Sequence, residues 1–286
     1  MSRATPAVDF ISALDAPLDV VRQDFGKWAP TLAILIYSGV AIQIPLQFAN
    51  RWMMEDLQAG NMEAMLTWLP VILGGSCISL PLIFLGLAAE SACIGNVVAG
   101  RPAGLGAALA PLASLNFWVA LFLSGIFSLL AALTCCIGGF LVWIPLGLIM
   151  PVALEEKLGF QAVQRSVDLG MMRTGPAWHE RPGWKIVALT LAYFVLSTAA
   201  GAVAQVPMLA SMGWEFYDAL TSGDPSKMAT MGTVNPWAAT VGMLLAATVR
   251  LFSDAYYWAG LFLIYKDARE RSSGTALEAA IEGPAT

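Results

Sequence analysis

Six long apolar runs decide what this 286-residue chain can fold into. Each run is 17 to 29 residues long, and about 20 apolar residues let an α-helix cross the hydrocarbon core of a bilayer. Water is absent from that core, so a spanning segment must satisfy its backbone hydrogen bonds internally, which favours helices. The predicted spans are residues 29–48, 66–89, 116–134, 138–154, 184–208 and 237–265.

The composition supports this interpretation. Hydrophobic residues make up 58% of the chain and charged residues only 12%, whereas soluble domains carry about 25% charged residues. So few charges leave too little polar surface to cover a soluble globule, and no basic block is dense enough for nucleic acid. We therefore predict an all-α fold, a polytopic membrane helix bundle of six transmembrane helices in three hairpins, with membrane lipids as its surroundings and no nucleic-acid partner.

Basic residues are distributed unevenly between the predicted spans. Of the fifteen Lys and Arg residues, Arg51 and Lys227 fall on one side of the membrane, Arg250 lies inside the last span, and twelve fall on the other side. The positive-inside rule places these twelve in the cytoplasm. Both ends, residues 1–28 and 266–286, are then cytoplasmic, as six crossings require. The twelve are Arg3, Arg22, Lys27, Arg101, Lys157, Arg165, Arg173, Arg181, Lys185, Lys266, Arg269 and Arg271.

Two cytoplasmic segments are predicted to form amphipathic helices in the membrane interface. In the first, Pro17 is expected to open a helix that places Leu18, Val21, Phe25 and Trp28 on one stripe, with Trp28 at headgroup level. A soluble helix packed on a loop is the alternative. Aspartates interrupt residues 1–28, so a cleaved signal peptide is not expected.

The second amphipathic segment follows the fourth span. Glu155, Glu156 and Lys157 end the apolar run, and a helical stripe of four apolar residues comes next. Its spacing predicts a helix that lies flat on the membrane surface. The stripe consists of Phe160, Val163, Val167 and Met171.

Two sequence motifs resemble a known family. The run IPLGLIMPVALEEKLGFQAVQRSVDLG and the tail LIYKDARERSSGTALE are similar to patterns of a bacterial six-span family. That family is labelled the glycerophosphoryl diester phosphodiesterase membrane domain, and it includes related uncharacterised membrane proteins. The resemblance implies the six-span fold and a multi-pass location in the bacterial cytoplasmic (inner) membrane. Lys266 and the pair Pro145-Leu146 depart from the pattern.

The resemblance does not imply hydrolysis. Some relatives carry a phosphodiesterase barrel after the membrane region, but here Thr286 comes about 20 residues after the last span, so no barrel is expected. His179 is the single histidine, which excludes multi-histidine metal sites. A redox or metal role of the vicinal pair Cys135 and Cys136 stays open. We expect no enzyme activity, catalytic residue, cofactor or metal.

Arg250 and Asp254 form the sharpest polar feature. Arg250 lies near the middle of the last span, where an unpaired charge costs roughly 2.5–3.5 kcal/mol on insertion scales. The i,i+4 spacing lets the two side chains meet on one face of a helix. One interpretation is a structural pair that faces the bundle, and the other is an intramembrane polar site.

Arg165, Ser166 and Asp168 form a second candidate group. They are expected on the solvent face of the helix after the fourth span, where Arg165 could contact lipid phosphates. The alternatives are a headgroup-level anchor and a contact for a soluble partner.

These features favour a non-enzymatic scaffold or accessory subunit of a membrane complex, with partner proteins and an oligomeric state that one sequence does not identify. The alternative is a transporter or channel for a lipid-like or small amphiphilic substrate, which would use the polar site around Arg250 and Asp254. An intramembrane enzyme would need further ionisable residues at the same depth.

Overall fold

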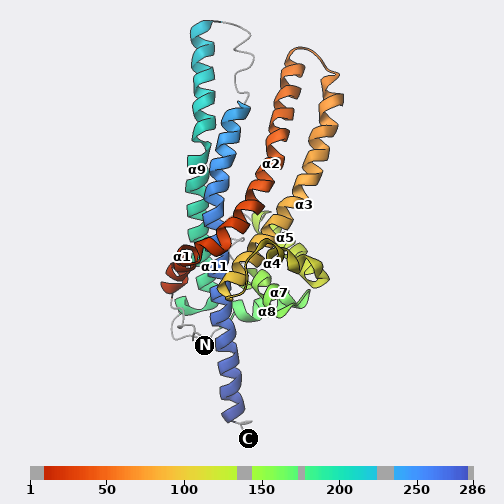
Figure 1. The fold of residues 1–286 in the computed structure, drawn as a ribbon. Coiled ribbons are helices and arrows are strands. Elements are labelled where there is room, and N and C mark those ends of the chain that lie inside the picture. The colour runs from red at the N-terminus through yellow and green to blue at the C-terminus, as the bar shows by residue number, and fades with distance from the viewer. Residues whose placement is uncertain (1–9, 134–143, 173–177, 224–234, 283–286) are drawn as a thin grey trace. The chain divides into compact units, whose positions relative to one another are not determined.

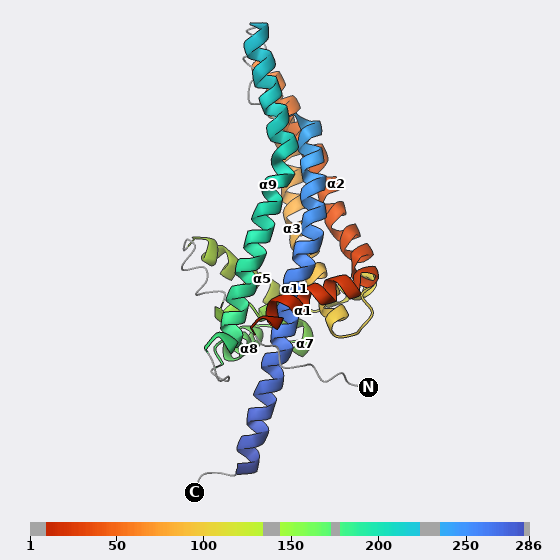
Figure 2. The ribbon, with the colours of Figure 1, turned by 90° about the vertical axis from the view of Figure 1, so that its left-hand side faces the viewer.

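The computed structural model describes residues 10–133, 144–172, 178–223 and 235–282. Within these ranges the chain is helical and holds no β-strand (Figures 1 and 2), which confirms the predicted all-α fold. The helices are α1 (Ser12–Gln23), α2 (Phe25–Gln58), α3 (Ala64–Val98), α4 (Leu105–Leu109), η1 (Ala110–Ala113), α5 (Leu115–Leu133), α7 (Ile149–Glu156), α8 (Gln161–Gly170), η2 (Trp178–Glu180), α9 (Pro182–Ser222) and α11 (Pro236–Glu282).

Four helices, namely α2, α3, α9 and α11, are long and apolar enough to cross a membrane by length and composition. The shortest of them, α2, has 34 residues and is about 51 Å long at 1.5 Å per residue. The α4–η1 segment and α5 form a pair bent by 91°, which would add a fifth crossing if it were one broken span. Four of the predicted spans, 29–48, 66–89, 184–208 and 237–265, lie within the four long helices.

The other two predicted spans have different outcomes. The third, 116–134, corresponds to α5 of 19 residues. The fourth, 138–154, begins outside the described residues, as does the predicted turn at Cys135 to Ile137. Its described part contains a turn at Gly147–Leu148 and then α7, which has only eight residues and buries Ile149 to Ala153. A crossing at residues 138–154 therefore stays a prediction.

The long helices continue beyond the apolar runs that predict them. The expected polar loop after residue 48 is largely the last turns of α2, where Arg51 Nε donates to Glu55 Oε1 at 2.6 Å. In the same way, α9 continues to Ser222 and α11 to Glu282. An apolar run marks where a helix meets lipid, whereas the helix ends only where capping and propensity fail.

The chain divides into two compact units, each described separately. Unit 1 comprises Met1–Thr31, Ala88–Phe194 and Ser253–Thr286, and unit 2 comprises Leu32–Leu87 and Val195–Phe252. The four long helices contribute residues to both units.

Unit 1 has an apolar core around α7. Leu148, Ile149 and Val152 belong to one buried cluster with Leu189 of α9 and Tyr265 of α11. Within this unit, the short helices α7 and α8 lie close together (Figure 1), and both contribute to the same core as α11. The core is also joined by residues of α5 and α8, so segments that are far apart in the sequence share one interior.

The N-terminal segment corrects the expectation for Pro17. α1 begins at Ser12, five residues before Pro17, and Pro17 is buried inside the helix rather than opening it. Trp28 is fully buried in unit 1, and its indole Nε1 donates to the carbonyl of Val21 at 3.1 Å. Trp28 therefore packs inside the protein, where a hydrogen-bond acceptor suits its indole, and its position at headgroup level stays a prediction. Leu18 is exposed, as an interfacial stripe requires.

Unit 2 consists of two pairs of helical segments. Both views show α2 beside α3 and α9 beside α11 within this unit (Figures 1 and 2). Gly75 lies against the side chain of Leu46, and a Cβ on Gly242 would lie 2.9 Å from the carbonyl oxygen of Ala204. Tyr37 and Thr248 share a hydroxyl hydrogen bond of 2.7 Å. Small residues at helix contacts are typical of membrane helix packing.

Candidate functional site

The turn after α7 holds a backbone conformation that residues other than glycine rarely adopt. Lys157 has φ +56°, and it is the single described residue other than glycine with a positive φ. This left-handed conformation costs an L-residue roughly 1–2 kcal/mol. Glycine usually occupies this position at the C-terminus of a helix because it has no Cβ.

Neighbouring groups fix this turn. The side-chain amide of Asn116 donates to the Lys157 carbonyl at 3.1 Å. Gly159 permits this approach, since a Cβ there would lie 3.0 Å from Asn116 Oδ1. Unfavourable backbone conformations persist where the surroundings determine them, and they cluster at functional sites. The backbone of Lys157 is therefore fixed, while the residue itself is exposed.

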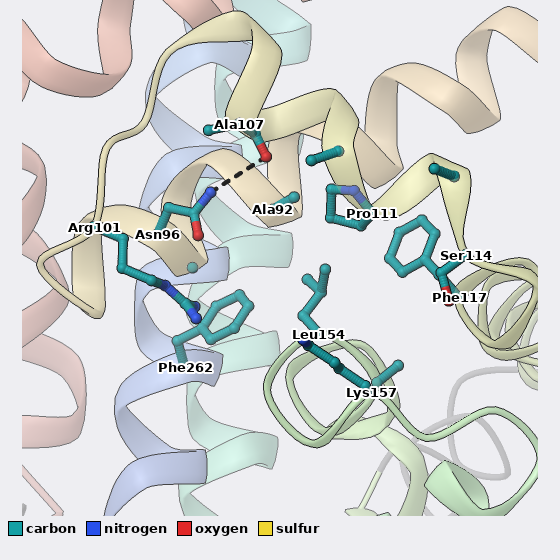
Figure 3. A pocket seen from close by; sticks show the side chains of 14 residues that line it. Ala92, Asn96, Arg101, Ala107, Pro111, Ser114, Phe117, Leu154, Lys157 and Phe262 are labelled. Carbon is teal, nitrogen blue, oxygen red and sulfur yellow. Dashed lines mark hydrogen bonds between the residues drawn. The ribbon is translucent and has the colours of Figure 1, made fainter.

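Lys157 lines a cavity of about 450 Å³ in unit 1 (Figure 3). The lining comes from α3 and the loop that follows it, from α4 and η1, and from α5, α7 and α11. Arg101 and Lys157 supply two positive charges, and no carboxylate is among the lining residues that the structure describes. The apolar part of the lining includes Phe117, Leu154 and Phe262.

A polar amide also faces this cavity. The Asn96 side-chain nitrogen donates to the Ala107 carbonyl at 3.4 Å. Its oxygen points toward the cavity (Figure 3). The cavity therefore combines two cations, one hydrogen-bond acceptor and an apolar wall, a mixture typical of small-molecule sites.

The loop that carries Arg101 is closely fixed. The carbonyl of Ala103 accepts from the hydroxyl of Thr31 at 3.0 Å and from the thiol of Cys93 at 3.3 Å. At the end of α3, Lys266 Nζ donates to the Val98 carbonyl at 2.6 Å. Cationic donors at the last carbonyls of a helix are favourable because these groups lack intrahelical partners.

The carboxylates next to Lys157 have partners inside unit 1. Glu155 forms an ion pair with Arg101. Glu156 Oε1 accepts from the Tyr265 hydroxyl at 3.0 Å and from Arg165 Nε at 3.4 Å. In contrast, no described residue forms an ion pair with Lys157. The three charged residues that end the fourth apolar run therefore differ in their contacts. Glu155 and Glu156 bind other parts of unit 1, whereas Lys157 lines the cavity.

A buried ion pair joins α9 to α11 in the same unit. Lys185 is fully buried, and its Nζ lies 2.8 Å from Asp267 Oδ2. Arg271 Nε donates to the other carboxylate oxygen at 3.0 Å. Sequence reasoning counted Lys185 as a cytoplasmic flanking charge and missed its burial, since only the i,i+4 pair of Asp267 and Arg271 is visible in the sequence.

The structure places Arg250 and Asp254 on α11 but assigns them to different units, Arg250 to unit 2 and Asp254 to unit 1. Asp254 is only 2% exposed and accepts a 2.8 Å hydrogen bond from the Tyr193 hydroxyl. Sequence reasoning missed Tyr193 because it lies 61 positions away. The pairing of Arg250 with Asp254 stays a prediction.

The second candidate group is split by the fold. Asp168 is exposed, but Arg165 is half-buried against Glu156, and Ser166 is fully buried with its hydroxyl donating to the Pro145 carbonyl at 2.8 Å. The prediction that Ser166 lies on a solvent face is wrong.

The reason is that the buried face of α8 carries small residues in addition to Leu169. Its buried residues include Ala162, Ser166 and Gly170, and a Cβ on Gly170 would lie 2.6 Å from the Ile144 carbonyl oxygen. Close backbone contact selects small side chains, so Phe160 and Met171 of the predicted stripe face outward, 74% and 59% exposed.

In the part of the chain that the structure describes, no group of three or more His, Cys, Asp or Glu side chains could hold a metal ion. Cys135 and Cys136 lie outside the described residues, so their redox or metal role is untested.

No protein-family description, curated protein or solved structure matches this chain. The resemblance to the six-span family therefore stays a prediction from the sequence.

Proposed function

We propose that this chain is a multi-pass protein of the bacterial inner membrane that acts as a non-enzymatic scaffold or accessory subunit. The proposal includes six crossings, with residues 116–134 and 138–154 as the middle hairpin, and two cytoplasmic termini. The four long apolar helices support the membrane location.

Reporter fusions test the proposed topology. Fusions after Ala59, Cys136 and Gly223 should report the outer side of the membrane, and fusions after Gly100 and Gly274 should report the cytoplasmic side.

The outward face of α8 carries the scaffold proposal. Phe160 and Met171 are exposed there, next to Asp168. Behind them, Arg165 bonds to Glu156 and Ser166 bonds to Pro145, so the helix is fixed to the core of unit 1. Exposed aromatic and methionine side chains at the two ends of this helix suit a protein contact, because such residues are enriched at interfaces.

A pull-down in mild detergent tests the scaffold function. The wild-type chain and a Leu66→Ser control should recover a partner in stoichiometric amount, because Leu66 is an exposed apolar residue of unit 2 away from α8. The double variant Phe160→Ser/Met171→Ser should lose that partner. Wild-type protein that purifies alone would contradict the scaffold function.

A second candidate is a transporter for a lipid-like or small amphiphilic substrate, favoured by the buried carboxylate of Asp254. Buried ionisable groups inside membrane helices mark transport pathways in many proteins. Flux of such substrates into liposomes should then require Arg250 and Asp254, and Arg250→Leu or Asp254→Asn should abolish it. Equal flux with both variants would reject this candidate.

A further inference from the structure

We propose that the cavity around Lys157 binds the anionic phosphate head of an amphiphile, with Lys157 and Arg101 as its cationic contacts. The inference does not depend on the scaffold function, since it concerns a ligand site in unit 1 rather than the outward face of α8. It assigns to the cavity a class of ligand, namely a phosphate ester that carries an acyl or alkyl chain.

Charge is the first argument. The described lining contains two cations and no carboxylate. Glu155 engages Arg101 from outside the lining, whereas Lys157 has no ion pair among the described residues. A cavity with excess positive charge attracts an anion, and a charge-assisted contact with a phosphate oxygen is stronger than a neutral hydrogen bond.

The backbone of Lys157 is the second, independent argument. A lysine occupies a left-handed position where glycine would be favoured. Asn116 and Gly159 hold the turn in this conformation. A side chain kept there at the expense of stability indicates a function for that side chain.

The rest of the lining indicates an amphiphile rather than a free anion. Phe117, Leu154 and Phe262 form an apolar wall, and the Asn96 oxygen is available to accept from a ligand hydroxyl. A volume of about 450 Å³ exceeds what inorganic phosphate alone would fill and falls within the range of small-molecule sites. The cavity therefore fits a headgroup with the first part of its chain.

Native mass spectrometry of the full-length protein in mild detergent tests this site. The probes are dioctanoyl phosphatidylglycerol, dioctanoyl phosphatidylcholine and inorganic phosphate. We expect phosphatidylglycerol to bind best, because the choline cation opposes the charge of the cavity. Inorganic phosphate should compete only weakly, because it does not use the apolar wall.

Four variants assign the binding to Lys157 and Arg101. Lys157→Gln should weaken phosphatidylglycerol binding about tenfold, the effect of one charge-assisted contact, and Lys157→Arg should restore most of it. Glu155→Gln should strengthen binding severalfold, because it releases Arg101 from its ion pair. Arg22→Gln is the matched control, since Arg22 is an exposed cation of unit 1 outside the cavity, and it should leave binding unchanged.

Lys157→Gly separates a ligand role from a structural one. This variant removes the left-handed penalty together with the charge, so its melting temperature should rise while phosphatidylglycerol binding falls about tenfold. A structural lysine would instead lower the melting temperature when removed. Three results would each overturn the proposal. They are unchanged phosphatidylglycerol binding in the Lys157 variants, equal binding of phosphatidylcholine and phosphatidylglycerol, and competition by inorganic phosphate at equal concentration.

Discussion

Unit 1 and unit 2 share the same four long helices but are stabilised in different ways. Unit 1 holds the shared apolar core, the buried pair of Lys185 and Asp267, and side chains that bond to loop carbonyls. Unit 2 holds glycine contacts and few buried side chains, and it exposes large apolar residues such as Leu66, Val203 and Trp237. Unit 1 resembles a folded domain, whereas unit 2 has the surface expected of helices in lipid.

This difference explains where polar chemistry is found. A charged side chain is tolerated in an apolar interior only when a partner satisfies it. Unit 1 provides such partners through its short helices and loops, so its charges form contacts and line a cavity. Unit 2 has Arg51, Glu55 and Asp56 near the end of α2. Arg51 bonds to Glu55 within that helix, and Asp56 accepts from the Trp68 indole of α3 at 3.0 Å.

The largest expected effect comes from breaking the buried pair of unit 1. Lys185→Met should destabilise the protein by about 3–5 kcal/mol, because it leaves the carboxylate of Asp267 without one of its cations. Lys185→Met/Asp267→Leu should recover part of that loss. The control in unit 2 is Arg51→Met, which breaks a more exposed pair worth below about 0.5 kcal/mol. Thermal unfolding in detergent measures the stability of all three variants. Equal losses of stability for Lys185→Met and Arg51→Met would show that the buried pair of unit 1 is worth no more than the exposed pair of unit 2.

A steric substitution should have the next largest effect in unit 1. Gly170→Ala places a methyl group 2.6 Å from the Ile144 carbonyl oxygen. The backbone must then shift, at a cost of about 1–3 kcal/mol. Gly26→Ala is the matched control because nothing lies within 4 Å of its Cβ position. A wild-type melting temperature for Gly170→Ala would show that α8 is not fixed against Ile144.

In unit 2, two glycine-to-alanine substitutions should change the stability in opposite directions. Gly242→Ala brings a methyl group to 2.9 Å from the Ala204 carbonyl oxygen and should destabilise by about 1–2 kcal/mol. Gly201→Ala has open space within α9 and should stabilise by up to about 1 kcal/mol, the difference in helix propensity. If both substitutions stabilise the protein to the same extent in thermal unfolding, α9 and α11 do not pack closely in unit 2.

The smallest expected change is a gain in stability on substituting Lys157 beside the cavity. Lys157→Gly should stabilise unit 1 by about 0.5–1 kcal/mol, because glycine removes the left-handed penalty but gains conformational freedom in the unfolded chain. Lys27→Gly provides the comparison, since Lys27 lies within a helix and glycine there should destabilise by a similar amount. Chemical or thermal unfolding checks the sign, and a loss of stability for Lys157→Gly would contradict the strain argument.

Sequence patterns were informative for whole elements and less so for faces. Long apolar runs predicted α2, α3, α9 and α11 because length and hydropathy suffice to define a spanning helix. They failed at Ser166 of α8, which was expected on a solvent face but is buried. The hydrophobic pattern does not record how closely two backbones approach, and that approach decides which face of α8 is inside.

The site was less predictable than the fold. Arg250, Asp254 and Arg165 could be selected because their spacing is local. The cavity could not, since Arg101 and Lys157 are 56 positions apart in the sequence and Phe262 comes from α11. The positive φ of Lys157 also has no signature in the sequence, where glycine would be the usual sign of such a turn.

By itself the sequence predicted that this chain is helical and that residues 29–48, 66–89, 184–208 and 237–265 belong to long apolar helices, and it fixed where the charges lie along the chain. These properties follow from composition and local periodicity. Only the tertiary structure decided which charges are paired, which face of α8 is buried, and that Arg101 and Lys157 line one cavity. Partners distant in the sequence set those outcomes, because an ion pair or a close backbone contact depends on positions in space.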